Sequence, residues 1–127
     1  MSLATPEDLI KSYIDAYNRF DLDAMCALLA SDIRFEHHTN GALGVQTDGL
    51  HAFRALAETG AALFTEREQR ITSITQSDDA IIISLAYHGR LSVDIPDGPP
   101  AGTVLDLTGE SEFAFHGNLI CKIVDRS

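Results

Sequence analysis

The fold of this chain is decided by the stretch from Leu9 to His38, LIKSYIDAYNRFDLDAMCALLASDIRFEHH. Apolar residues recur at helical spacing as far as Phe20, with polar residues on the opposite side. Asp21 is a good cap for a second, short helix, which the pair Ser31-Asp32 is expected to end. Residues 33–37 then alternate between apolar and polar, as strands with one wet face do. This order predicts helices packed over a curved sheet, with a small pocket between them.

The composition limits the classes of protein to which the chain can belong. A chain of 127 residues with 45% hydrophobic content predicts a single globular domain spanning residues 1–127. The formal net charge of -10 repels phosphates and anionic membrane surfaces, which argues against nucleic-acid and membrane partners. No apolar run approaches the ~20 residues that span a bilayer, and the first residues lack the blocks of a signal peptide. We therefore expect a cytoplasmic protein.

The rest of the chain predicts one more helix and then a series of strands. Thr5 and Asp8 form a capping box around Pro6 at the start of the first helix. Residues 39–48 are expected to be a loop, and Asp48 to cap a third helix that runs to about Leu63. Alternating, β-branched segments predict strands at 68–76, 80–93, 103–115 and 119–124, separated by turns or loops at 77–79, 96–100 and 116–118. Helices followed by long hairpins indicate an α+β fold.

Neither a metal nor a nucleotide cofactor is expected. Cys26 and Cys121 lie far apart and in apolar surroundings, which favours two reduced core residues. His37 and His38 are adjacent in a strand, so their side chains point to opposite faces and do not form a metal pair. The sequence contains no Gly-rich phosphate cradle, nucleophile elbow or zinc-protease motif.

Several short motifs, in one order, carry a family resemblance. They are Tyr13 in SYIDAYNRFDLD, the stretch LLASDIRFEH, Tyr87-His88-Gly89-Arg90, and Phe113-Ala114-Phe115 followed by His116-Gly117-Asn118. Together they make the chain similar to the nuclear transport factor 2-like superfamily, in particular its SnoaL-like and ketosteroid-isomerase-like branch. The resemblance implies a cone: a strongly curved mixed or antiparallel sheet wraps a long N-terminal helix, two further helices accompany it, and a pocket opens at the wide end.

The resemblance also implies positions for the chemistry. His37 falls where ketosteroid isomerases carry their strand carboxylate base, and Tyr13 falls where they carry a helix tyrosine. Their second donor, a protonated carboxylic acid, would fall at Ser111. One position is kept, one holds a different base and one holds a weaker donor, so the resemblance implies a general proton-transfer pocket rather than steroid isomerisation.

The two residues expected to be catalytic are His37 and Tyr13. His37 shares a strand face with Ile33 and Phe35, so it should point into the cone. An imidazole with an unperturbed pKa of about 6.5 can accept or deliver a proton near neutral pH. The Tyr13 hydroxyl could stabilise a developing oxyanion. The alternatives are a buried histidine satisfied by a carbonyl or by Tyr13, and a core tyrosine that merely packs.

Further residues are expected to bind the substrate, and these line the pocket by alternation or helical spacing: Tyr17, Phe35, Phe53, Leu85, Tyr87, Ser111 and Phe113. Glu110 and Glu112 take the opposite face of their strand. Asp106 also falls on that outer face, but a bulge would turn it inward and make it the best candidate for a pocket carboxylate.

Three functions follow from this pattern. The first is a cofactor-independent proton-transfer enzyme of the isomerase, cyclase or dehydratase type, acting on a small apolar molecule with a carbonyl or hydroxyl. The second is a module that binds such a ligand without converting it. The third is a dimeric scaffold, with a homodimer contact through the outer sheet face. That face would carry Ile82, Ser84, Ala86, His88, Thr108, Glu110, Glu112, Ala114, Ile120 and Lys122.

Overall fold

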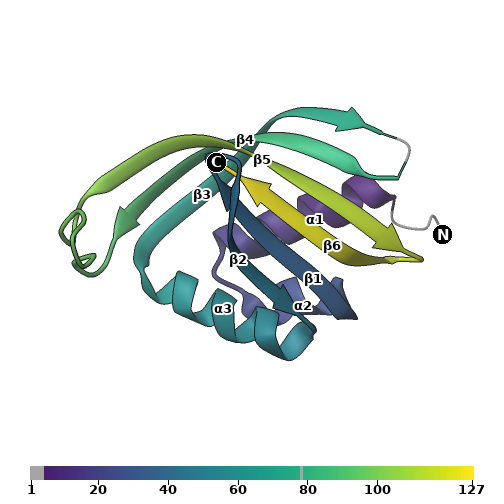
Figure 1. The fold of residues 1–127 in the computed structure, drawn as a ribbon, viewed down its shortest axis with the longest axis horizontal. Coiled ribbons are helices and arrows are strands. Elements are labelled where there is room, and N and C mark those ends of the chain that lie inside the picture. The colour runs from purple at the N-terminus through teal and green to yellow at the C-terminus, as the bar shows by residue number, and fades with distance from the viewer. Residues whose placement is uncertain (1–4, 78) are drawn as a thin grey trace.

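The computed structural model describes residues 5–77 and 79–127. These residues form three helices and six strands, which together make an α+β fold (Figure 1). The elements are α1 (Pro6–Asn18), α2 (Leu22–Ala27), β1 (Leu29–Thr39), β2 (Ala42–Asp48), α3 (Leu50–Ala62), β3 (Phe64–Gln76), β4 (Ile81–Leu91), β5 (Val104–His116) and β6 (Leu119–Arg126).

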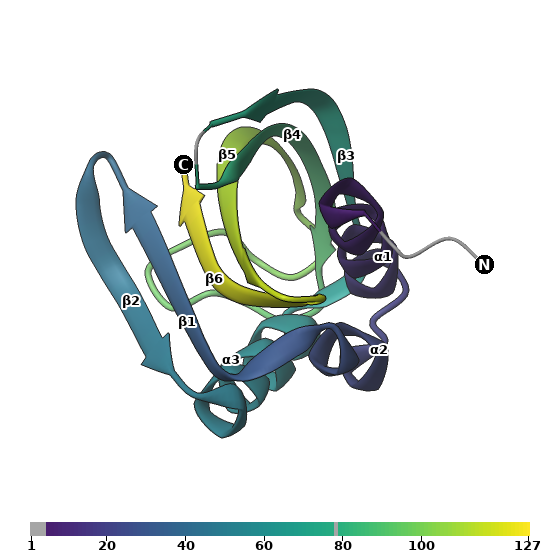
Figure 2. The same ribbon diagram turned by 90° about the vertical axis from the view of Figure 1, so that its right-hand side faces the viewer.

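The strands form one mixed sheet in the order β2-β1-β6-β5-β4-β3. Neighbouring strands are antiparallel except β1 and β6, which are parallel. Viewed from the side, strands β3 to β6 curl around one hollow side of the sheet, and α1 and α3 lie along that side (Figure 2). The predicted α+β cone, with its curved sheet and three helices, is therefore confirmed.

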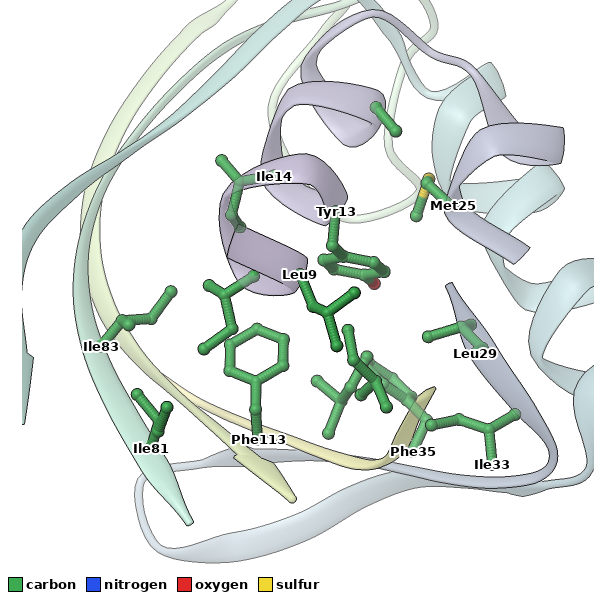
Figure 3. Packing of buried hydrophobic residues seen from close by; sticks show 14 of the residues in the cluster. Leu9, Tyr13, Ile14, Met25, Leu29, Ile33, Phe35, Ile81, Ile83 and Phe113 are labelled. Carbon is green, nitrogen blue, oxygen red and sulfur yellow. The ribbon is translucent and has the colours of Figure 1, made fainter. Parts of the chain in front are cut away.

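The hydrophobic core lies between α1 and the concave face of the sheet. Side chains from one stripe of α1, among them Leu9, Tyr13 and Ile14, belong to the same buried cluster as Phe113 and the isoleucines of the strands (Figure 3). The predicted capping box starts this helix: the Thr5 hydroxyl accepts from the Asp8 amide at 3.1 Å, and the Thr5 amide donates to the Asp8 carboxylate at 3.0 Å. Capping and apolar spacing together fix which face of α1 is buried.

The predicted loop at 39–48 is wrong in its larger part, because residues 42–48 form strand β2. This strand pairs antiparallel with β1 through a tight turn, in which Asn40 and Gly41 have φ values of 52° and 82°. Almost all of its residues are exposed on both faces, so it lacks the apolar alternation that marks a half-buried strand. Asp48 consequently ends β2 rather than capping a helix, and the cap of α3 is Gly49, without a side-chain hydrogen bond.

Two further expectations about local structure need correction. Ser31 and Asp32 do not end the second helix; α2 stops at residue 27, and both residues lie exposed inside β1. Ile120 does not face outward but is fully buried. The register between β5 and β6 shifts at residues 114–115, so the first residues of β6 face the opposite way from the one that simple alternation predicts. Of the predicted turn at 77–79, position 78 lies outside the described residues.

Candidate functional site

A cavity of about 480 Å³ opens between the concave face of the sheet and the helices. Its walls are mainly apolar, with a few polar groups, which is the usual make-up of a small-molecule site. Strands β1, β5 and β6, together with Tyr13 of α1, contribute the polar groups at one end, and Tyr17 of α1 with β3 and β4 contributes those at the other.

Three polar side chains lie in a row across neighbouring strands at the first end. His37 on β1 is the register partner of Asp125 on β6, and Asp125 is in turn the partner of Ser111 on β5. All three line the cavity. Adjacent strands lie only about 4.8 Å apart, so register alone brings an imidazole, a carboxyl and a hydroxyl to one side of the sheet.

Two carboxyl groups line the cavity, those of Asp125 and Glu110, and Asp125 is the one in this row. The Ser111 hydroxyl donates a hydrogen bond of 2.5 Å to its Oδ1. Burial raises the pKa of the Asp125 carboxyl above the usual aspartate range, and the hydrogen bond from Ser111 and the nearby His37 act in the lowering direction without cancelling this effect. A carboxyl group in this state holds its proton more tightly than a surface aspartate, which suits acid and base chemistry near neutral pH.

His37 and Tyr13 complete this end of the cavity. The Nε2 atom of His37 lies 3.2 Å from the Ser127 hydroxyl. Tyr13 lies on α1 with its ring edge-on to Phe113, the ring centroids being 5.9 Å apart. Burial first, and then the negative charge of Asp125, raises the pKa of the Tyr13 hydroxyl well above its ordinary value. The phenol therefore stays neutral and can donate a hydrogen bond.

The structure brings most of the expected binding residues to the cavity wall: Tyr17, Phe35, Phe53, Leu85, Tyr87 and Ser111. Phe113 is the exception. Only 1% of its surface is exposed, and it lies in the core behind the Tyr13 ring rather than on the wall. Alternation places Phe113 on the correct face of β5, but α1 packs directly over it and closes it off from the cavity.

The sequence makes Asp106 the best candidate for a pocket carboxylate, but in the structure Asp125 lines the cavity and Asp106 does not. The pairing of β4 with β5 runs without a register shift, so no bulge turns Asp106 inward. Its carboxylate stays on the outer face, where it lies 2.8 Å from Nδ1 of the exposed His88. The signal for Asp125 is present in the chain: alternation through Ile123 predicts an inward side chain at 125, but the strand expected from sequence ends at 124.

Arg67 on β3 is a second cavity residue that lies just outside a predicted strand. Alternation backward from Ile71 through Gln69 reaches it, yet the strand is expected to start at 68. Arg67 is only 7% exposed. Its Nε donates to the carbonyl of Tyr17 at 3.0 Å, and its guanidinium lies 3.7 Å from the centroid of the Tyr17 ring. A permanent positive charge therefore lies at the second end of the cavity.

Glu110 and Arg126 also line the cavity and form an ion pair at 3.2 Å, whereas His38 and the two cysteines lie away from it. His38 contacts Glu36, with Nε2 2.8 Å from Oε1, and the hydrogen bond from His38 is the largest of the causes that lower the pKa of Glu36 to about 2. Cys26 and Cys121 are both half-buried and free. In the described part of the chain no cluster of three or more His, Cys, Asp or Glu side chains has the geometry to hold a metal ion. Nor does that part contain a helix long and apolar enough to cross a membrane.

Comparison with known proteins places this geometry in context. A family model described as the SnoaL-like domain matches residues 10–123. A candidate polyketide cyclase from Xanthomonas campestris is 26% identical with a TM-score of 0.79, covering 95% of this chain and 88% of that one. No protein in the curated comparison matches the chain.

Two further solved structures share the fold. A candidate polyketide cyclase from Pseudomonas putida is 24% identical with a TM-score of 0.74, covering 98% of this chain and 91% of that one. A protein with a ketosteroid isomerase-like fold from Catenulispora acidiphila, solved in complex with trimethylamine, is 18% identical with a TM-score of 0.77, covering 95% and 85%. At these identities the likeness concerns the fold, since one fold hosts many activities.

Proposed function

The chain belongs to the SnoaL-like domain family, and on this premise we propose that it is a cofactor-independent proton-transfer enzyme of the isomerase, cyclase or dehydratase type. Its substrate is a small apolar molecule that bears a carbonyl or a hydroxyl group. One observation carries the proposal: a carboxyl group with a raised pKa shares a largely apolar cavity with a histidine and a neutral tyrosine. Pairs of titratable groups held in different environments are typical of acid and base catalysis.

The proposed reaction begins with Asp125 in its carboxylate form. The carboxylate removes a proton from a carbon next to the substrate carbonyl, so a C–H bond breaks and an O–H bond forms on Asp125. The electron pair moves onto the carbonyl oxygen, where the Tyr13 hydroxyl donates a hydrogen bond to the enolate that develops. In a β,γ-unsaturated substrate, Asp125 returns the proton to the far carbon of the conjugated enolate, which gives isomerisation. Alternatively, the enolate carbon attacks a second carbonyl and closes a ring, and the alkoxide that forms takes the proton from Asp125.

His37 has a supporting place in this scheme. Because it is the register partner of Asp125 and faces the same cavity, its imidazole can deliver a proton to a substrate oxygen while Asp125 takes one from carbon. Loss of a protonated hydroxyl as water would then give the dehydratase variant of the reaction. The Ser127 hydroxyl next to Nε2 helps to fix the orientation of the ring.

The direct test measures proton exchange without knowledge of the natural substrate. Aryl ketones and β-keto esters would be incubated with the protein in D₂O, and deuterium uptake next to the carbonyl followed by NMR. Catalysed uptake that disappears when the cavity residues are changed is the expected result. Ligands that raise the melting temperature but never exchange would instead identify a binding module, and this proposal would be wrong.

Changing His37 separates binding from catalysis. We expect His37→Ala and His37→Asn each to slow exchange by ~10²–10⁴-fold, the usual contribution of a general acid or base. The asparagine variant should still bind the ketone, because an amide can replace the hydrogen bond but not the proton transfer. His38→Asn is the matched control, since the His38 ring contacts Glu36 rather than the cavity. Exchange that is equally fast in all three variants would remove His37 from the mechanism.

We also propose that the protein forms a homodimer through the outer face of its sheet. A groove on that face is lined by charged side chains together with small ones, including Ala86 and Thr108. Light scattering should give twice the monomer mass, and Ala86→Arg should halve it, because Ala86 lines this groove and not the cavity. A monomer mass that stays constant with concentration would contradict the dimer.

A further inference from the structure

The end of the cavity opposite Asp125 is built around a buried cation. The guanidinium of Arg67 lies between two aromatic rings, 3.7 Å from the centroid of Tyr17 and 4.4 Å from that of Phe20. Both rings come from the end of α1 and the residues just after it, whereas Arg67 comes from β3. Packing from two sides holds the guanidinium in place and removes it from bulk water.

This cation lacks a counter-ion in the described part of the chain. No carboxylate there forms an ion pair with Arg67, although other arginines, such as Arg54 and Arg126, form them on the surface. Within the same residues its Nη2 atom is buried without a hydrogen-bond partner, and Nη1 has none either. Leaving a buried charge unpaired is costly, so a partner that arrives from outside would relieve the cost.

Two phenols extend the set of donors beside Arg67. The Tyr17 hydroxyl donates to the Tyr87 hydroxyl at 3.4 Å, and both residues line the cavity. Burial raises the pKa of each phenol above its ordinary value, and the positive charge of Arg67 opposes this without overcoming it. Both phenols therefore keep their protons. The bond between the two hydroxyls uses one of these protons, so the other remains for a ligand.

We propose that this end of the cavity is a carboxylate subsite, in which Arg67 pairs with an acidic group of the substrate and the Tyr87 hydroxyl donates a further hydrogen bond. The inference rests on the proposed function and narrows it. The substrate is an apolar carbonyl compound with a carboxylate at its far end, bound so that the carbonyl meets Asp125 and Tyr13. A guanidinium matches a carboxylate in shape as well as in charge, since two parallel N–H bonds can form.

Arg67 also has a structural contact, which the test must separate from ligand binding. Its Nε donates to the Tyr17 carbonyl in the last turn of α1, where a positive charge also interacts favourably with the negative end of the helix dipole. That bond uses one of the N–H donors of the guanidinium and leaves the donors on Nη1 and Nη2. The structural role therefore accounts for the position of Arg67 but leaves its terminal nitrogens without partners.

The experiment compares acids with their esters in calorimetric titrations of the intact protein. The probes are 2-naphthyl keto acids, in which methylene chains of increasing length separate the carbonyl from the carboxylate, and the methyl ester of each. We expect the best acid to bind about 10- to 100-fold more tightly than its ester, as charged hydrogen bonds are worth this much. The net charge of -10 repels anions, so a preference for the acid must arise locally.

Matched variants locate the source of the preference. Arg67→Gln should abolish it and change the affinity for the ester little, and Arg70→Gln should preserve it, because Arg70 lies exposed on the same strand and on the outer face. If Arg67→Gln does not fold, Tyr87→Phe should still reduce the preference. Equal affinity of the unmodified protein for acid and ester, or a preference that survives Arg67→Gln, would overturn the subsite.

A further variant distinguishes this proposal from the proposed function. Asp125→Asn should bind the acids in preference to the esters as the unmodified protein does, while it loses proton exchange. Loss of exchange without any acid preference would refute the subsite alone. Acid preference without exchange in the unmodified protein would refute the enzyme and retain the subsite.

Discussion

Replacing Asp125 with asparagine is expected to slow proton exchange at carbon by ~10²–10⁴-fold, because the amide cannot take up the proton. The change preserves the shape of the side chain, and the Asn oxygen can still accept the hydrogen bond from Ser111. Deuterium uptake by an aryl ketone, measured by NMR, gives the rate. The loss should appear in turnover rather than in ketone affinity, since the carboxylate acts on the reacting carbon.

The same substitution should make the protein more stable near neutral pH. A raised pKa means that the folded protein binds the Asp125 proton more tightly than the unfolded chain does. Stability is therefore lost as the pH rises from the ordinary aspartate value of about 3.9 through the folded pKa. Asparagine removes this loss, and we expect a gain in stability at neutral pH that vanishes in acid. Urea unfolding of both proteins at several pH values measures the difference.

Asp106→Asn is the control for both effects. Asp106 is exposed on the outer face beside His88, so its loss should leave exchange and the pH profile of stability nearly unchanged. If Asp125→Asn exchanged protons as fast as Asp106→Asn, Asp125 would not be the base. If Asp125→Asn were less stable than the unmodified protein at neutral pH, the pKa of Asp125 would not be raised in the folded protein.

The second large effect is structural: Phe113→Ala should lower the free energy of unfolding by about 3–5 kcal/mol. Phe113 is among the largest fully buried side chains, and a close-packed interior relaxes only partly into the space left by such a truncation. The melting temperature should fall by roughly 10–20 °C. Calorimetry or circular dichroism checks both values.

The loss of Phe113 should also affect the site, because its ring supports the Tyr13 ring edge-on. A Tyr13 that is free to tilt would position its hydroxyl less well against the enolate. The control is Leu43→Ala on β2, where the side chain is 51% exposed and truncation should cost less than about 0.5 kcal/mol. Similar melting temperatures for the two variants would show that Phe113 contributes little to the stability of the core.

The parts of the fold that sequence predicts well depend on local signals. The capping box at Thr5 and the apolar stripe of α1 identify that helix, because caps and helical spacing act within a few residues. Strand β2 escapes prediction because it is exposed on both faces and owes its existence to pairing with β1. Such pairing is a property of the partner strand and not of the segment itself.

Two of the charged residues that line the cavity escape prediction for another reason. Asp125 and Arg67 each lie one residue beyond the predicted bounds of a strand, where apolar alternation fades because the site itself requires polar side chains. His37 and Tyr13, by contrast, share a face with apolar residues of the same element, and these reveal which way they point. Local patterns weaken at functional positions, since chemistry rather than packing selects the residue there.

The place of β6 in the sheet has a consequence for how the protein is made. This strand is the last in the sequence, yet it lies between β1 and β5, in parallel contact with β1. A growing chain can therefore form its early hairpin and its later meander separately, but the two halves become one sheet only when the final strand enters the gap. Such long-range closure is slow. The register that places Asp125 of β6 beside His37 of β1 and Ser111 of β5 therefore forms only when β6 enters the sheet.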